Sequence, residues 1–174
     1  MSQITHYKGP GKIYFNKILI EIIKLAKLDQ RNIQILDYGC GTKQLSKLLN
    51  KKVYNFDILE EYNEIKILDY KKYDLIVFNH VLMYLKDYEI VELFDKIYSL
   101  NKNCEIVIGL GRQNLISQIL KLITFNFKAH KGTKISYLQQ INIIKKFNIL
   151  DYKKNIFFMT DIYYLDFKNY KKFI

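Results

Sequence analysis

How the chain folds is decided by one stretch, Ile35-Leu36-Asp37-Tyr38-Gly39-Cys40-Gly41-Thr42. It begins as a short apolar run, which is typical of a buried strand, and ends in two closely spaced glycines. Glycine has no Cβ, so it permits a sharp turn and lets a ligand approach the backbone closely. The stretch therefore predicts a strand that turns tightly into a helix, Gln44 to Leu49, with a ligand at the turn.

An acidic residue stands at the end of the next apolar run. Asp57 comes 20 residues after Asp37 and closes a predicted strand, Val53 to Ile58. A carboxylate at such a strand end accepts hydrogen bonds from the ribose hydroxyls of a nucleoside that lies across the sheet edge. The glycine turn and this acid together predict a nucleoside site at the carboxyl ends of the strands.

Helix and strand patterns alternate on both sides of this stretch. Helices are expected at 13–28, at 44–49, after a capping Asp87, at 114–127 and at 136–147. Strands are expected at 33–38, 53–58, 65–68, 75–79, 105–110, 148–158 and 162–167, the last two around a Thr160-Asp161 turn. The alternation predicts one α/β domain, residues 1–174, with a doubly wound, mainly parallel seven-stranded sheet and one antiparallel edge strand.

Four motifs in order resemble those of the class I, Rossmann-like S-adenosylmethionine-dependent methyltransferases. They are the glycine turn, the acid in Phe56-Asp57-Ile58, the pair Asp69-Tyr70, and the run from Tyr73 to Leu85. The resemblance extends from residue 33 to residue 111. Lys43 departs from the family pattern, because many members have a third glycine there. The connection from Asp57 to Asp69 is short for the usual helix, so the adenine side is expected to be more open.

The resemblance implies that S-adenosylmethionine is the cofactor. It assigns cofactor binding to Asp37, Tyr38, Gly39, Cys40, Gly41, Asp57, Ile58, Asp69, Tyr70 and Asn79. Asp37 would lie near the amino end of the methionine moiety, Asp57 at the ribose and Asp69 near the exocyclic amine of adenine. Asp37 has the structural alternative of capping the turn, although its place in the glycine motif favours binding. Asp57 has few structural reasons to end a buried strand, whereas Asp69 would equally end one.

Three further features are candidates for the acceptor side. His80 follows a predicted strand and would act as a general base on an acceptor hydroxyl or amine, or would only shape the pocket. Tyr7, in an N-terminal arm of residues 1–12, is an aromatic candidate for contact with the sulfonium cation, although the chain has 15 tyrosines. Residues 112–134 are a candidate substrate lid. The alternatives for this segment are a helix packed on the sheet edge and a patch that touches a membrane surface.

The charge of the chain bears on the acceptor. The net charge is +11, but Arg31 and Arg112 are the only arginines, and the lysines are spread along the whole chain. Nucleic-acid readers usually depend on arginine forks, and Asn79-His80-Val81-Leu82 lacks the Pro-Pro of amino-group nucleic-acid methyltransferases. We therefore expect a small-molecule acceptor, such as a sugar, a lipid-linked compound or another metabolite. The alternatives are an RNA methyltransferase and a non-catalytic cofactor-binding or partner-binding module.

The remaining composition points to the cytoplasm. Cys40 and Cys104 are isolated and are expected to be reduced thiols, and no Cys/His cluster has metal-ligand spacing. No apolar run approaches the ~20 residues of a membrane span. The N-terminal residues lack the apolar segment of a signal peptide. We expect no metal and no transmembrane segment, and the oligomeric state is left open.

Overall fold

The computed structural model describes residues 10–112 and 132–171. Its helices are α1 (Pro10–Leu25), α2 (Gln44–Leu49), α3 (Asp87–Leu100) and α5 (Tyr137–Ile144), with two short 3-10 helices, η1 (Tyr70–Lys72) and η2 (Leu82–Tyr84). Its strands are β1 (Ile35–Tyr38), β2 (Val53–Phe56), β3 (Leu75–Asn79), β4 (Glu105–Gly111), β5 (Asn148–Ile156) and β6 (Thr160–Asp166).

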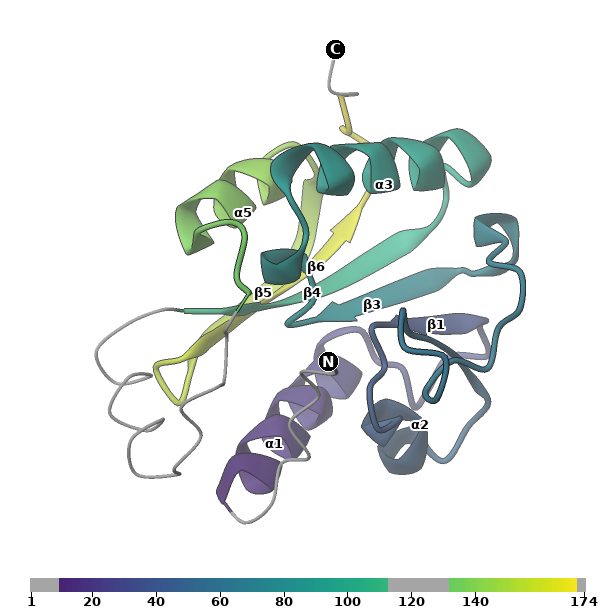
Figure 1. Cartoon of the computed structure of the whole chain (residues 1–174), viewed down its shortest axis with the longest axis vertical. Helices are drawn as coiled ribbons and strands as arrows, with labels where there is room; N and C mark the ends of the chain where they lie inside the picture. Colours follow the sequence, from purple (N-terminus) through teal and green to yellow (C-terminus); the bar gives the residue numbers. More distant parts are fainter. Residues whose placement is uncertain (1–9, 113–131, 172–174) are drawn as a thin grey trace.

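The strands form one sheet in the order β2-β1-β3-β4-β6-β5, with helices on both faces (Figure 1). β1 to β4 are mutually parallel, β6 is antiparallel to β4, and β5 is antiparallel to β6. The expected doubly wound α/β fold is therefore confirmed. Because the parallel strands end at one edge, the loops that follow β1, β2 and β3 meet there.

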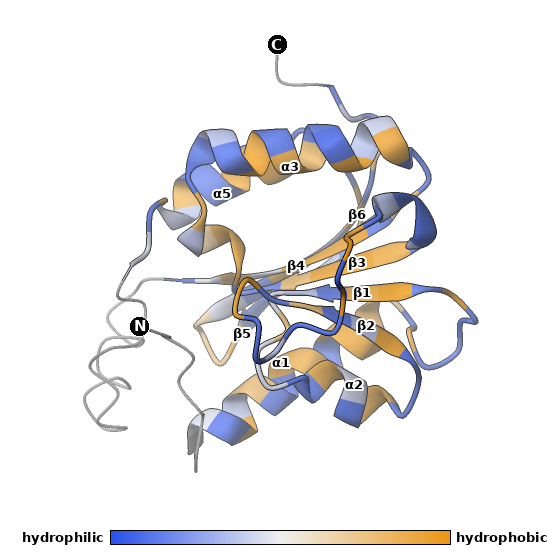
Figure 2. Ribbon diagram, turned by 45° about the vertical axis from the view of Figure 1, so that its right-hand side comes forward, coloured by the Kyte–Doolittle hydropathy of each residue, from blue (hydrophilic) through white to orange (hydrophobic). Residues whose placement is uncertain are grey.

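Hydrophobic residues of the helices face the sheet and hydrophilic residues face outward (Figure 2), and buried apolar clusters lie on both faces of the sheet. Between the sheet and α3 with α5, the core includes Phe78, Phe94 and Phe147. Between the sheet and α1 with α2, it includes Ile18, Leu45 and Val77. β3 is buried on both faces, as its continuous apolar sequence predicts.

The described residues form six strands rather than the expected seven. Residues 65–68 lie in an irregular loop, and Ile67 is 83% exposed. A parallel strand beside β2 would need a crossover of a dozen or more residues, and only Asp57 to Glu64 separate the two segments. The apolar residues of this segment gave a strand pattern, but the connection is too short to bring a parallel strand against β2.

The C-terminal hairpin also differs from the expectation. The antiparallel strand is β6, which lies between β4 and the edge strand β5. The turn occupies residues 157–159, while Thr160 and Asp161 are fully buried at the start of β6. Phe157 and Phe158 take left-handed backbone conformations, with φ of 48° and 58°. Phenylalanine rarely adopts such a conformation, so these residues do not predict a turn from sequence.

Two helix starts differ from the prediction, and one helix is not described. α1 begins at Pro10 rather than at residue 13, because proline is well suited to the first turn of a helix. Asp87 is the first residue of α3 and not its cap; the Glu89 carboxylate accepts a hydrogen bond from the Lys86 backbone N–H at 2.6 Å. The expected helix at 114–127 lies outside the described residues.

Candidate active site

The glycine turn after β1 is shaped by close packing. Gly39 has φ of +77°, and a Cβ at this position would lie 2.4 Å from Val81 Cγ2. The backbone N–H groups of Gly39 and Cys40 both donate to the Phe56 carbonyl, at 2.7 and 3.1 Å. The turn is therefore fixed to the end of β2, and no side chain fits at Gly39 without displacing the loop after β3.

Two buried carboxylates flank this turn. Asp37 on β1 is 4% exposed, and Asp57, directly after β2, is 7% exposed. Asp57 accepts hydrogen bonds from the backbone N–H groups of Gly41 and Leu59, both at 3.0 Å. Burial, followed by the charge of Asp57, raises the pKa of Asp37 to about 7. Burial and mutual repulsion therefore make ionisation of both acids unfavourable, and a cationic ligand at this strand edge would reduce that free-energy cost.

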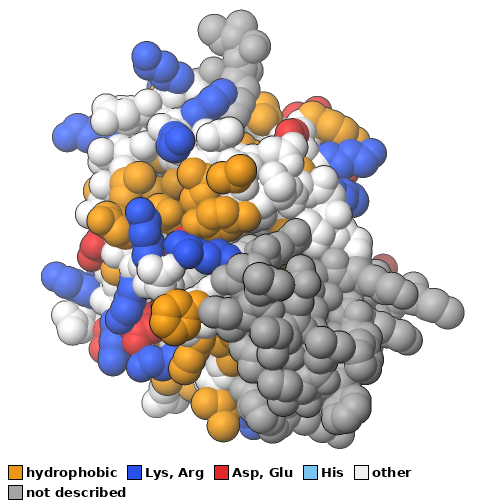
Figure 3. All heavy atoms as spheres, turned by 90° about the vertical axis from the view of Figure 1, so that its left-hand side faces the viewer, with side chains coloured by type: hydrophobic (Ala, Val, Ile, Leu, Met, Phe, Trp, Pro, Cys, Tyr) orange, Lys and Arg blue, Asp and Glu red, His pale blue; other side chains and the backbone are white. Residues whose placement is uncertain are grey.

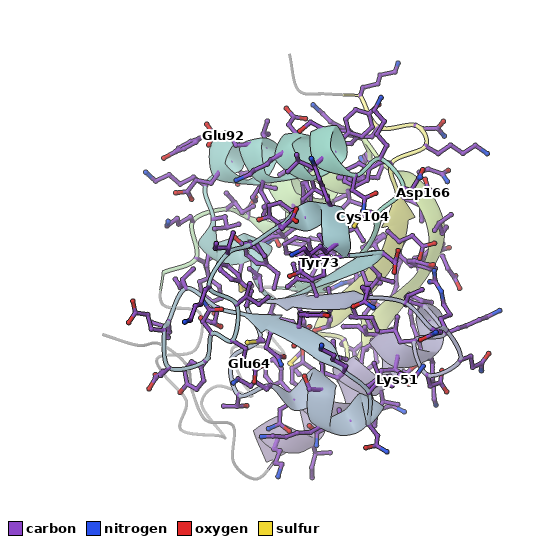
Figure 4. The ribbon with its side chains drawn as sticks, turned by 90° about the vertical axis from the view of Figure 1, so that its right-hand side faces the viewer. Lys51, Glu64, Tyr73, Glu92, Cys104 and Asp166 are labelled. Atoms are coloured by element: carbon purple, nitrogen blue, oxygen red, sulfur yellow. The ribbon has the colours of Figure 1, made fainter. Side chains whose placement is uncertain are left out.

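A polar network holds the short connection after β2 in place of a helix. Glu64 accepts from Lys43 Nζ and from Asn55 Nδ2, both at 2.6 Å, and Ser46 Oγ donates to Asn55 Oδ1 at 2.9 Å. Glu64 lies on the α2 side of the sheet (Figure 4). Lys43, which departs from the family pattern, therefore ties the glycine turn to this connection. The described residues between Asp57 and Asp69 form no α-helix, as the shortness of this connection predicts.

The other predicted cofactor residues have different surroundings. Ile58 is 83% exposed beside Asp57. Asp69 accepts from the Lys71 backbone N–H at 3.2 Å and so caps η1, a structural role that differs from the strand end named as its alternative. Tyr70 is only 3% exposed, and its hydroxyl interacts with that of Tyr38. Tyr70 is thus part of the core and presents almost no surface to a ligand.

The last residue of β3, Asn79, and the residue after it, His80, lie against two glycines of β4. A Cβ on Gly109 would lie 2.5 Å from Asn79 Oδ1, and a Cβ on Gly111 would lie 3.0 Å from His80 Nδ1 and Cε1. Asn79 Oδ1 is buried and has no hydrogen-bond partner among the described residues. His80 has φ of +58°, and its Nδ1 is buried. The glycines therefore create the space in which both polar side chains lie.

Sequence reasoning missed two polar residues at this edge. Thr160 bonds to His80 Nε2 at 3.0 Å and to the Tyr14 hydroxyl. Asp161 accepts from Arg112 Nε and Nη2, at 3.0 and 2.8 Å, and from the Tyr137 hydroxyl. The available signal was a polar pair next to a strongly apolar strand, which we assigned to a turn.

Some predictions fall on residues that the structure does not describe, namely Tyr7 and most of the candidate lid, residues 113–131. Within 10–112 and 132–171, no group of three or more His, Cys, Asp or Glu side chains is arranged to hold a metal ion. In the same ranges, no helix has the length and hydropathy needed to cross a membrane. Cys40 and Cys104 are buried free thiols.

Comparisons with known proteins identify relatives of this arrangement. A family model described as a methyltransferase domain matches residues 12–145. A magnesium protoporphyrin IX methyltransferase from Synechocystis PCC 6803, solved with bound SAH, is 16% identical with a TM-score of 0.63, covering 93% of this chain and 89% of that one. The PH0226 protein of Pyrococcus horikoshii OT3 is 13% identical with a TM-score of 0.68, covering 95% and 96%.

A third solved structure, the small RNA methyltransferase HEN1, is 11% identical with a TM-score of 0.67, and the match covers 95% of this chain but 26% of that one. A search of curated proteins finds no match. At these identities the solved structures show a shared fold, and the family model provides the assignment to a family.

Proposed function

The chain belongs to the methyltransferase domain family, and from this membership we propose that it transfers the methyl group of S-adenosylmethionine to a small-molecule acceptor. The observation that carries the proposal is the buried acid pair, Asp37 and Asp57, on either side of a glycine turn. The site would then lie at the carboxyl ends of β1, β2 and β3, where ligands bind in open α/β sheets.

The residues present fit this cofactor. S-adenosylmethionine carries an ammonium group, a sulfonium and a ribose diol, and a buried acid pair is suited to positive charge and to hydroxyl donors. Asp57 would hold the ribose and Asp37 the ammonium, with Gly39 and Gly41 giving the backbone access. The buried Asn79 Oδ1 lacks a partner among the described residues and would accept a hydrogen bond from the ligand.

The remaining roles follow from position and exposure. Ile58 offers exposed apolar surface for the adenine directly beside Asp57. Cys40 would contribute through its backbone, because burial first, and then nearby carboxylates, raise the pKa of its thiol to about 12. Tyr38 and Tyr70 would support the floor of the site. Asp69 would orient the loop that faces the adenine by capping η1.

S-adenosylmethionine supplies, when bound, a methyl group already activated by attachment to sulfonium. The chain then has to align an acceptor, and alignment alone supplies a large part of the rate. His80 would take up the proton that the acceptor loses when it is methylated. In this structure His80 Nε2 bonds to Thr160 and Nδ1 is buried beside Gly111, so His80 would take this proton through Nδ1.

The arginines favour a small molecule over a nucleic acid. Arg31 donates to Glu105 at 2.6 Å and to the Tyr164 hydroxyl at 2.8 Å, and Arg112 donates to Asp161. Both guanidinium groups of the chain are therefore bound to its own carboxylates. In Figure 3, lysine and arginine side chains are spread among other side chains over the coloured part of the visible face. Such a surface does not form the arginine-lined track that reads phosphates and bases.

Calorimetric titration with S-adenosylmethionine and S-adenosylhomocysteine tests the cofactor site. We expect binding by the wild type and loss of most of the affinity in Asp57→Ala. Asp29→Ala is the matched control, because Asp29 is an exposed acid outside the site. Failure of the folded wild type to bind either compound would contradict the proposal and would leave a partner-binding module as the better explanation.

The acceptor class is tested with methyl-labelled cofactor against pools of metabolites and against total RNA. Label in the metabolite pool supports the proposal. Label in RNA, together with binding that weakens steeply with salt, would favour the RNA methyltransferase instead. We further propose a cytoplasmic location, since both cysteines are free thiols.

A further inference from the structure

A chain of hydroxyl groups reaches His80 from two other elements. Thr160, the first residue of β6, is fully buried and lies opposite Gly111 of β4 in the antiparallel register. Its Oγ1 lies 3.0 Å from His80 Nε2 and also bonds to the Tyr14 hydroxyl on α1. Residues 14, 80 and 160 are therefore linked in one line of hydrogen bonds across the site edge.

The imidazole of His80 is enclosed by residues from several directions. The ring of Phe15 lies 5.3 Å from it at 60°, and the ring of Tyr14 lies 6.4 Å from it at 90°. On the β4 side, the absence of a Cβ at Gly111 leaves room for Cε1 and Nδ1. The bond from Nε2 to Thr160 is a directional contact that a ring turned over by 180° would lose, because Cε1 would then take the place of Nε2.

We propose that Thr160 is a positioning residue, which fixes the orientation and the tautomer of His80 by accepting a hydrogen bond from Nε2–H. The inference rests on the proposed function for its effect on turnover. A threonine hydroxyl has one donor and two acceptor sites, so in this arrangement Thr160 accepts from Nε2–H and its own proton is available to the Tyr14 oxygen. With the proton held on Nε2, the lone pair is on Nδ1, which is the nitrogen directed to Gly111. That is the tautomer in which Nδ1 would accept a proton from the methyl acceptor.

The location of Thr160 at the start of β6 brings its hydroxyl within reach of His80. β6 runs antiparallel to β4, so its first residue lies at the same edge as the last residue of β4. Thr160 faces α1, where it meets Tyr14, whereas its neighbour Asp161 bonds to Tyr137 of α5 on the other side of the sheet. Successive residues of one strand thus stabilise polar groups on opposite faces.

The first test is NMR of the histidine side chains, which needs no acceptor. The chain has only three histidines, His6, His80 and His130, and His80→Gln identifies the signals of His80. We expect one tautomer with Nε2–H, and exchange of this proton with water slowed by the Thr160 bond. Thr160→Val keeps the shape but removes the hydroxyl, so exchange is expected to become at least tenfold faster and the two tautomers to mix. Thr160→Ser should restore the wild-type signals.

Tyr14→Phe provides a second variant, because it removes only the far end of the line of bonds. A smaller acceleration of Nε2–H exchange is expected, since Thr160 keeps its bond to His80. Unchanged His80 signals in a folded Thr160→Val protein would overturn the inference, as would a wild type in which the proton lies on Nδ1.

Cofactor titration and turnover separate this inference from the proposed function. Thr160→Val should bind S-adenosylmethionine like the wild type, and with an acceptor it should lower kcat more than tenfold with little change in KM. If the wild type does not bind the cofactor, the proposed function fails, and the NMR result still decides the role of Thr160. If Thr160→Val changes KM alone, Thr160 is not a positioning residue for His80.

Discussion

Replacing Asp37 with asparagine should make the ligand-free protein more stable at high pH. Asp37 is almost completely buried beside Asp57, and its pKa rises from the ordinary 3.8 to about 7, mainly through burial. Each pKa unit corresponds to about 1.36 kcal/mol, so the ionised Asp37 costs on the order of 4 kcal/mol of folding free energy at pH 8. Asparagine is nearly isosteric with the protonated acid and carries no charge at any pH.

The sign of the pH dependence follows from the raised pKa. Between about pH 4 and pH 7 the folded chain retains a proton on Asp37 that the unfolded chain releases, so stability from this group is full below pH 4 and falls until about pH 7. Above pH 7 the stabilisation that protonated Asp37 contributes is completely lost. The difference between Asp37→Asn and the wild type should therefore be near zero at pH 4, grow up to pH 7, and remain constant beyond it.

Urea unfolding of both proteins from pH 4 to pH 8.5 measures this difference, and taking the difference cancels the other titrating groups. Calorimetry on the same samples should show weaker cofactor binding in Asp37→Asn, because the carboxylate that faces the ammonium is lost. A variant that is less stable than the wild type at pH 8, or a difference that does not change with pH, would refute the reasoning about the buried acid pair.

Three other substitutions or reactions test separate parts of the site. Asp57→Ala should weaken cofactor binding roughly ten- to a hundredfold, the equivalent of a charged hydrogen bond of about 1.5–3 kcal/mol, and unchanged affinity in calorimetry would remove Asp57 from the site. Gly39→Ala should lower the free energy of unfolding by about 2 kcal/mol or more, since a left-handed backbone and a contact with Val81 both oppose a Cβ; a thermal midpoint equal to that of the wild type would contradict this. The thiols of Cys40 and Cys104, whose pKa values burial raises to about 12, should react with Ellman's reagent only after unfolding, so rapid labelling of the native protein would show that they are accessible.

The parts of the site that were predictable from sequence are those encoded locally. The strand, the glycine turn and the acid at the end of β2 each leave a pattern within a few residues, and the structure brings Asp37, Gly39 and Asp57 together. The location of Asn79 and His80 at the end of β3 was predictable in the same way, because an apolar run precedes them, while their roles stay predictions.

The parts that were not predictable depend on partners far away in the sequence. Thr160 and Asp161 are the kind of polar pair that usually forms a turn, and nothing near them indicates that Tyr14, 146 residues away, completes the bonds of Thr160. Likewise, Gly109 and Gly111 leave room for the side chains of Asn79 and His80, which are far from them in the sequence. The irregular loop at 65–68 was misread because local apolar character does not reveal whether a neighbouring strand edge is within reach.

The chain on either side of residues 113–131 is anchored to the sheet. The Arg112 backbone N–H donates to the Met159 carbonyl at 2.6 Å, and its guanidinium binds Asp161. At the other end, the Lys134 backbone N–H donates to the Met83 carbonyl at 2.7 Å. These two anchored ends are suitable sites at which to exchange the intervening segment for one of different length or sequence. The entropy cost of closing the loop changes only slowly with the length of the insert. If the protein acts as proposed, such exchanges would alter the candidate substrate lid and leave Asp37 and Asp57 in place.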